Sequence, residues 1–258
     1  MKIISLVENT SHKEGIKAEH GLSLYIETDD RRILFDMGQT DLFAENAQRL
    51  GVDLSGVDLA ILSHGHYDHG GGLARFLEIN THAPVYVNKH AFGPHYNGCD
   101  KYIGLDPALK GSPRIIFTEG DTSLSPNIRI LSLEGTECKH PVDSAGLTVR
   151  CEGGFIPDDF RHEQYLLIKE DSKRILISGC SHKGILNIAE LWAPDLLIGG
   201  FHLSKHPLDA ELEKLAGTLE CIGSVYYTCH CTGEAQFEFM AERMSSLHYL
   251  SCGECIYL

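Results

Sequence analysis

The sequence predicts a layered α/β fold. Short apolar runs rich in β-branched residues alternate with segments of helical periodicity, and this alternation is typical of helices packed on a sheet. Several apolar runs end in a small residue followed by a polar one, as at Ser63-His64, and α/β proteins place functional loops at such points. Because 258 residues suit one large domain, we expect a single domain over residues 1–258.

The predicted strands are short, apolar and bounded by turn residues. They span residues 2–7, 22–27, 32–36, 59–63, 85–87, 114–117, 128–133, 165–169, 174–178, 196–199 and 224–228. The predicted helices carry apolar residues at helical spacing. They span residues 43–50, 72–78, 185–191, 209–218 and 233–245. The fourth of them follows Pro207, which suits the approach to a helix, while Gly217 weakens its end.

Between residues 89 and 163 the periodicity weakens. Gly, Pro and Asn are dense there, as in residues 92–98 and 153–159. A stretch of this length without strong periodicity inside one domain is usually functional. We therefore expect residues 89–163 to form an insertion or lid over the active site, and not a second domain.

The composition excludes several classes of partner. The formal net charge is −14 and no Lys/Arg cluster stands out, so the chain lacks the cationic patch that nucleic acid or an anionic membrane requires. Bound metal ions would still allow an anionic substrate, because they reverse the charge locally. The apolar run at the N-terminus is too short for a signal peptide, and no run approaches a membrane span. We expect a soluble cytoplasmic protein whose 9 cysteines are reduced thiols or metal ligands.

One segment carries most of the functional information. After the apolar run 59–63 the chain reads His64-Gly65-His66-Tyr67-Asp68-His69, followed by three glycines. Imidazole and carboxylate ligands suit zinc, iron, manganese or nickel. Alternation along the chain would turn His64 and His66 toward a first metal, and Asp68 and His69 toward a second. So many histidines and glycines in one short loop serve no packing purpose, and the loop is predicted to bind metal.

This segment resembles the H-x-H-x-D-H signature of the metallo-β-lactamase superfamily, and the resemblance extends over most of the chain. It implies an αβ/βα four-layer sandwich with two divalent metal ions, zinc being the first choice and iron, manganese or nickel the alternatives. It also implies that Asp36, in Asp36-Met37-Gly38, supports the ligating histidines from behind, and that His230 completes the second metal site.

The chain departs from the family pattern at one strand end. Where the family commonly has a bridging Asp after Gly, this chain has Cys180, and His182 follows two residues later. Either Cys180 bridges the metals as a thiolate, or His182 reaches the first metal and water alone forms the bridge. The family's separate histidine after the insertion has three candidate counterparts, His140, His162 and Glu163.

Five motifs together are similar to one subfamily, typified by the archaeal dihydropterin-ribofuranosylaminobenzene-phosphate synthase of methanopterin biosynthesis. They are residues 18–23, 63–69, 178–185, 199–203 and 230–233. The resemblance implies an enzyme acting on a phosphorylated or diphosphate-bearing small molecule, either as a hydrolase or as a pterin-type transferase that releases diphosphate. In the hydrolytic version Asp68 would bind metal and orient a metal-bridging hydroxide as the nucleophile. In the synthase version the metals would bind the departing diphosphate, and an amine or aryl carbon would replace water. One scaffold hosts many chemistries, so the substrate stays open.

Other residues carry weaker signals. His202 could bind substrate or transfer a proton, or could be a hydrogen-bonded loop histidine. Glu8, Asn9, Glu19 and His20 lie beside early strands and could line the pocket, and Lys183 could contact a phosphate or be solvated. Two cysteine pairs resemble half-sites for structural zinc. They are Cys229 with Cys231 and Cys252 with Cys255. If residues 229–231 were a strand, His230 and the two thiols would point to opposite faces.

Two other classes of function stay in view. The fold also hosts iron-dependent oxidoreductases, but the oxygen-reducing di-iron branch typically has Glu where this chain has His66, and it often carries a flavin domain for which this length leaves no room. A non-catalytic metal-binding module is the other alternative, and the completeness of the ligand set argues against it.

Overall fold

The computed structural model describes residues 1–258 and contains three β-sheets. The first has seven strands in the order β18-β1-β2-β3-β4-β5-β8. These are β18 (Cys255–Tyr257), β1 (Lys2–Val7), β2 (Ser23–Glu27), β3 (Arg32–Phe35), β4 (Leu59–Ile61), β5 (Val85–Asn88) and β8 (Ile115–Thr118). Neighbours are antiparallel from β18 to β3 and parallel from β3 to β8.

The second sheet also has seven strands, in the order β17-β16-β15-β14-β13-β10-β9. These are β17 (Leu247–Tyr249), β16 (Val225–Thr228), β15 (Leu196–Gly199), β14 (Lys173–Ile177), β13 (Gln164–Glu170), β10 (Ile128–Ser132) and β9 (Thr122–Ser123). Here β14 to β17 are parallel and the remaining pairs are antiparallel. The third sheet is small, with β12 (Gly154–Pro157), β11 (Leu147–Cys151), β6 (His95–Asn97) and β7 (Lys101–Tyr102).

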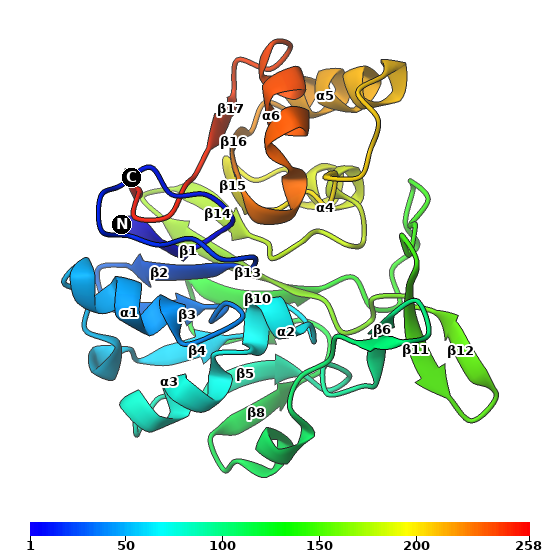
Figure 1. The fold of residues 1–258 in the computed structure, drawn as a ribbon. Coiled ribbons are helices and arrows are strands. Elements are labelled where there is room, and N and C mark those ends of the chain that lie inside the picture. The colour runs from blue at the N-terminus through cyan, green and yellow to red at the C-terminus, as the bar shows by residue number, and fades with distance from the viewer.

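Helices cover the outer faces of the two large sheets (Figure 1). On the first sheet lie α1 (Leu42–Arg49), α2 (Tyr67–Gly70) and α3 (Leu73–Ile79), and on the second lie α4 (Ile185–Trp192), α5 (Ala210–Ile222) and α6 (Glu234–Ala241). Three short 3-10 helices are η1 (Leu54–Gly56), η2 (Pro107–Gly111) and η3 (His230–Thr232). None of the helices is both long enough and apolar enough to cross a membrane.

Side chains that alternate between the two faces of each strand form three apolar layers, one between the two large sheets and one under the helices on each outer face. In β3, Ile33 and Phe35 face the second sheet, while Leu34 packs under α1 and α3. In β14, Ile177 faces the first sheet and Leu176 packs under α4 to α6. Successive side chains of a strand point to opposite faces, so one strand serves two layers. The four-layer αβ/βα sandwich expected from the resemblance is therefore confirmed.

Residues 89–163 do not form one continuous unit. They supply β8 to the first sheet and β9 and β10 to the second, so only the small sheet and its loops stand outside the sandwich. The sheet projects from one side of the molecule (Figure 1). A lid function for it stays a prediction.

Most predicted elements agree with the structure to within one or two residues. The helix predicted at 209–218 is longer, because α5 continues through Gly217 to Ile222 and ends at Gly223. The helix predicted at 233–245 is shorter, because α6 ends at Ala241 and the chain turns before β17. The small sheet, β9, β17, β18 and α2 escaped prediction, because their segments are short and have no clear periodicity.

Candidate metal centre

Candidate functional side chains gather where parallel strands end. His64 follows β4, Cys180 and His182 follow β14, His202 follows β15 and His230 follows β16. Because β14, β15 and β16 are parallel neighbours, their carboxyl ends meet at one edge of the second sheet. That edge faces the loop after β4 in the first sheet, and ligands of α/β proteins commonly bind at such edges.

The loop after β4 is tightly placed. His66 precedes α2 as its N-cap, so Asp68 and His69 lie in a single helical turn and not in an extended loop. A Cβ atom at Gly65 would collide with the backbone carbonyl of Ala91, so this close approach requires glycine. The turn redirects the side chains, and His64 lies near both His66 and His69. His64 and His66 share one group of potential ligands, as the alternation predicts, while the ring of His69 also lies close to that of His64.

The first group of potential ligands is His64, His66 and His182, whose ring nitrogens lie within 4.8 Å of one another. All three are buried, and His64 Nε2, His66 Nε2 and both ring nitrogens of His182 lack a hydrogen-bond partner. Burial, followed by the neighbouring histidines, holds the pKa of His64 and His182 well below the ordinary value. Neutral imidazoles with free lone pairs are the form that binds metal, so these residues fit a divalent ion.

The tautomer of His64 is set by its neighbour. Ser63 Oγ donates its only proton to Asp36 Oδ2 at 2.7 Å, so it accepts from His64 Nδ1 at 2.8 Å. The lone pair of His64 is therefore on Nε2, the atom without a partner. His182 is oriented differently, by stacking on Phe160 with ring centroids 4.4 Å apart.

The second group is Asp68, His69 and His230. His69 Nε2 lies 3.2 Å from His230 Nε2, and Asp68 Oδ2 lies 3.4 Å from His230 Nε2 and 3.9 Å from His69 Nε2. Burial opposes the charged form of Asp68, but the surrounding histidines outweigh it and hold the pKa of its carboxyl well below the usual range. Burial also opposes the charged form of His69 and so lowers its pKa. The carboxylates of Asp36 and Asp68 outweigh this effect and raise the pKa of His69 to about 9.

Asp36 supports this group directly. Its carboxylate accepts His69 Nδ1–H at 2.7 Å, which directs His69 Nε2 toward Asp68 and His230. It also accepts the backbone N–H and the hydroxyl of Ser63, so it reaches His64 only through that serine. This is the carboxylate–imidazole support usual for ligating histidines.

Cys180 lies between the two groups. Its Sγ is 3.1 Å from His69 Nε2, and it groups with His64 and His69 on one side and with His230 and Cys231 on the other. Burial, with the nearby Cys231 thiol, raises the pKa of Cys180 well above its ordinary value. The position suits a bridging ligand, and the burial suits a packed thiol, so both interpretations of Cys180 stay open.

Two buried carboxylates, not singled out as supports from the sequence, hold the ligand loops. Glu163 accepts the backbone N–H groups of His182 and Lys183 at 2.7 and 2.9 Å. Glu8 accepts the backbone N–H of His230 at 3.1 Å. Burial raises the pKa of both carboxyls. Only the tertiary structure pairs them with these loops.

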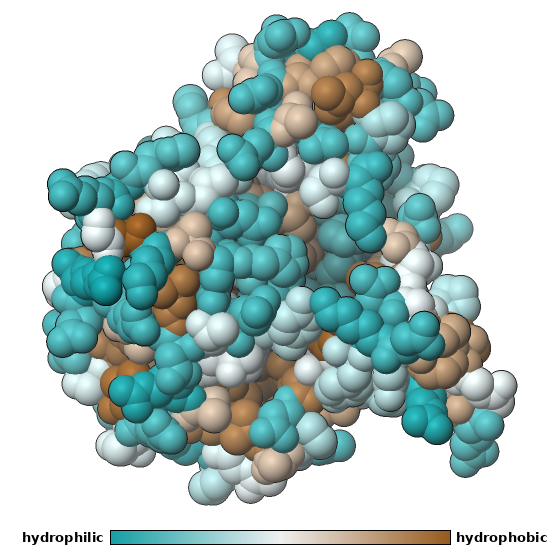
Figure 2. Space-filling model, viewed as in Figure 1, coloured by the Kyte–Doolittle hydropathy of each residue, from teal (hydrophilic) through white to brown (hydrophobic).

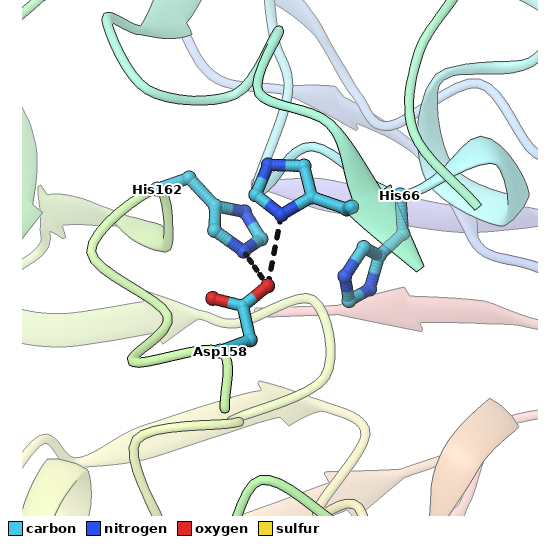
Figure 3. A group of neighbouring side chains, drawn as sticks. His66, Asp158 and His162 are labelled. Carbon is cyan, nitrogen blue, oxygen red and sulfur yellow. Dashed lines mark hydrogen bonds and ion pairs between the residues drawn. The ribbon is translucent and has the colours of Figure 1, made fainter. Parts of the chain in front are cut away.

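A third buried network lies beside His66 (Figure 3). Asp158 Oδ2 accepts from His95 Nδ1 at 2.8 Å and from His162 Nε2 at 3.3 Å, while His162 Nδ1 accepts the Gly65 N–H at 2.9 Å. Both nitrogens of His162 are therefore occupied. Burial alone would raise the pKa of Asp158. The hydrogen bonds from His162 and His95 outweigh the effect of burial and hold the pKa of this carboxyl well below the usual range. The network ties the small sheet to the loop that carries His66.

The other candidates for the family's separate histidine lie elsewhere. His140 Nε2 contacts Glu190 Oε1 at 3.1 Å on the rim of a cavity, and Glu163 has the supporting position already described. His182 is the residue that joins the His64 group.

The predicted substrate-binding residues have different surroundings. His202 lies with its ring centroid 4.3 Å from that of His182. His20 is exposed, and its Nε2 lies 3.2 Å from Asp68 Oδ2. Glu19 instead accepts from the backbone of Gln39 and Thr40 ahead of α1. Lys183 is half-buried beside His182.

Asn9 and the cysteine pairs complete the surroundings. Asn9 Oδ1 is 2.8 Å from His230 Nδ1. After β16 the chain enters η3, so residues 230–232 are not a strand. Cys231 therefore groups with His230, and the expectation that their side chains point to opposite faces is wrong. No group of potential ligands includes Cys229, Cys252 or Cys255, and all 9 cysteines are free thiols.

The fold and this centre define a class of protein. A family model of the metallo-β-lactamase superfamily matches residues 16–181. The chain belongs to that superfamily, and its buried His/Asp clusters form a candidate metal site.

Similar proteins are consistent with this membership. The chain is 30% identical to Tm1679, described as a metal-dependent hydrolase of the β-lactamase superfamily, with a TM-score of 0.83 over 100% of this chain and 99% of that one. It is 31% identical to an uncharacterized protein of Methanocaldococcus jannaschii over 88% of this chain and 89% of the relative. It is also 29% identical to the 7,8-dihydropterin-6-methyl-4-(beta-D-ribofuranosyl)-aminobenzene-5'-phosphate synthase of the same organism, over 99% of this chain and 96% of the relative.

Proposed function

We propose that this protein is an enzyme with two divalent metal ions that acts on a phosphorylated or diphosphate-bearing small molecule. The supporting observation is the pair of buried ligand sets at one strand edge, the first of which has four ring nitrogens without a partner. A buried polar atom without a partner costs about 1–3 kcal/mol, and a bound ion removes that cost.

In this proposal His64, His66 and His182 hold the first ion, and Asp68, His69 and His230 hold the second. Cys180 lies within reach of both sets. When bound, a pair of such ions neutralises phosphate oxygens and activates water. Zinc is the expected metal, because three or four nitrogen, oxygen or sulfur ligands at a buried site suit its tetrahedral preference.

The protein's own groups have separate tasks. The low pKa of Asp68 keeps its carboxylate ionised at neutral pH, so it can orient a nucleophile by accepting a hydrogen bond. Burial, followed by Lys205, lowers the pKa of His202 to about 4. His202 is therefore neutral at pH 7 and can donate one N–H to a substrate oxygen. His20, at the exposed side of Asp68, can meet the same substrate.

Both a hydrolase and a diphosphate-releasing transferase fit this arrangement. The similarity to Tm1679 favours a hydrolase, and the similarity to the dihydropterin synthase favours a transferase. The two differ in the acceptor, which is water in one case and an amine or aryl group in the other. With a net charge of −14, neither nucleic acid nor a membrane surface is an expected partner.

The test combines metal analysis with a substrate panel. Purified protein is loaded separately with zinc, manganese, iron or nickel, and elemental analysis is expected to give two ions per chain. A panel of phosphate and diphosphate esters is then assayed with water alone and with added amines. His64→Ala and His230→Ala should each lose metal, while His82→Ala, at an exposed histidine outside the centre, should not. Full metal content in both centre variants would overturn the ligand assignment, and a fully loaded protein inactive on every ester would overturn the function.

A further inference from the structure

A cavity of about 470 Å³ lies beside the first ligand set. His182 and His202 form its inner end, and its walls come from α4, from residues 201–207 and from the loop at residues 140–145. Figure 2 shows a hollow on this face, between the part built by α4 to α6 and the small sheet. The cavity therefore opens directly from the candidate metal centre.

The inner walls of this cavity are apolar. Ile185, Phe201 and Leu203 are nearly fully buried members of the core under α4 to α6, so their positions are fixed by packing. Leu186 of α4 and Leu215 of α5 are half-buried and pack against the same core. A phosphate group needs only a small part of this volume and no apolar wall. Cavities of this size usually enclose most of an organic ligand.

The mouth of the cavity is polar. Lys205 and His206 line it beside His202, and Asp143 is the acid among its lining residues. In a chain with a net charge of −14, Lys205 is the one lysine or arginine among the lining residues, and its ammonium group can pair with an anionic ligand there.

We propose that the substrate is an organic phosphate or diphosphate ester with a ring-sized apolar group, and that this group occupies the cavity between α4 and residues 201–207. The phosphoryl end then faces His182 and His202. This inference rests on the proposed function and adds the chemical class of the organic group. Burying the ring on Leu186, Phe201 and Leu215 would contribute binding free energy in proportion to the apolar area removed from water.

Binding of non-hydrolysable analogues tests this without requiring turnover. Calorimetry with zinc-loaded protein compares 1-naphthylphosphonate, methylphosphonate and inorganic phosphate. We expect the naphthyl compound to bind at least about tenfold more tightly than the methyl compound, from the extra apolar area buried. Equal affinities, or no binding of either phosphonate, would overturn the proposal.

Variants that fill the cavity test whether the naphthyl group binds there. Leu186→Trp should abolish the preference for the naphthyl group, because it lowers the affinity for the naphthyl compound at least about tenfold more than the affinity for methylphosphonate. The matched control is Leu191→Trp on the same helix, at a side chain that is 50% exposed and outside the cavity. Leu215→Trp gives a second test from another helix if Leu186→Trp fails to fold, as judged by its melting temperature. A naphthyl preference retained in a folded cavity variant contradicts the proposal.

Failure of the proposed function gives a different result. If the naphthyl preference is present and is lost in the cavity variants, yet no ester is turned over, the cavity assignment stands and the catalytic proposal fails. If phenyl phosphate is turned over but the naphthyl compound binds no more tightly than the methyl compound, the catalytic proposal stands and the cavity assignment fails.

Discussion

Two buried carboxylates act on the candidate ligands through the backbone. Glu163 binds the N–H groups of residues 182 and 183 and the hydroxyl of Tyr165, and Glu8 binds the N–H of His230 and the hydroxyl of Tyr249. Ser181 and His230 have φ angles of 59° and 50°, a left-handed conformation that costs free energy in residues other than glycine. The carboxylates hold these loops in place.

Glu163→Gln should weaken metal binding more than it weakens the fold. The amide keeps the size of the side chain but loses one acceptor, so the loop bearing His182 becomes less well ordered. Loss of such a supporting contact typically reduces metal affinity by about 10–100-fold. Competition titration with a chelator measures the affinity. Glu190→Gln, at a half-buried glutamate of α4 that pairs with His140, is the control and should bind metal normally. Normal affinity in Glu163→Gln would refute the positioning role.

Asp68→Asn should leave the protein folded and remove most activity. Asp68 lies in a single helical turn near His20, His69 and His230, and the amide cannot supply the charge that a metal and a nucleophile require. Circular dichroism and turnover of the best ester in the panel check the two halves of this statement. Unchanged turnover would contradict the role of Asp68.

Metal stoichiometry can decide whether Cys180 is a metal ligand or a packed thiol. If it is a ligand, the ion binds the thiolate and the thiol proton is released to solvent. Metal then protects Cys180 from alkylation, and Cys180→Ser lowers metal occupancy because a neutral hydroxyl is a poor ligand. Cys180→Asp should then restore occupancy with the carboxylate usual in the family. If Cys180 only packs, the Ser variant binds two ions normally and the Asp variant is destabilised by a buried charge. Full occupancy in Cys180→Ser therefore excludes the thiolate ligand.

At the scale of elements, the loop after β4 depends on one close contact. Gly65 passes the carbonyl of Ala91, where a Cβ atom does not fit. Gly65→Ala must shift the backbone between His64 and His66, so it should reduce metal content and lower stability by about 1–3 kcal/mol. Gly217→Ala, on α5 with open space around the added atom, is the control and should be neutral or slightly stabilising. Equal metal content in the two variants would show that the contact is not needed.

The sequence predicts the sandwich well because its strands and helices have strong periods. β1 and β15 were predicted with the residues found, and the H-x-H-x-D-H segment placed its residues at the centre of the site. Local patterns failed where long-range contacts decide the structure. Glu8 lies 222 residues from the His230 N–H that it binds, and His95 meets Asp158 across the small sheet. The turn of η3, which brings Cys231 beside His230, also has no periodic signal.

On the scale of the whole molecule, the candidate centre joins two halves. His64, His66, Asp68 and His69 belong to the loop after β4 in the first sheet, and His182 and His230 follow strands of the second. The halves also share the apolar layer between the sheets. The two chain ends lie together, with Met1 N 3.2 Å from Leu258 O. Metal ions bound at the centre would add a link between the halves at the open edge.

Removal of metal should therefore lower the melting temperature of the entire domain. A ligand that binds only the folded state stabilises it by about 4 kcal/mol when its concentration is about 1,000 times Kd. For a domain of this size each kcal/mol corresponds to about 2–4 °C, so zinc-loaded protein should melt roughly 10 °C above chelator-treated protein. Scanning calorimetry of both forms measures the shift. In a His64→Ala/His230→Ala double variant the shift should largely disappear, while His82→Ala should retain it. The same shift in the double variant would mean that zinc acts elsewhere, because the two histidines come from opposite sheets and their joint loss breaks both ligand sets.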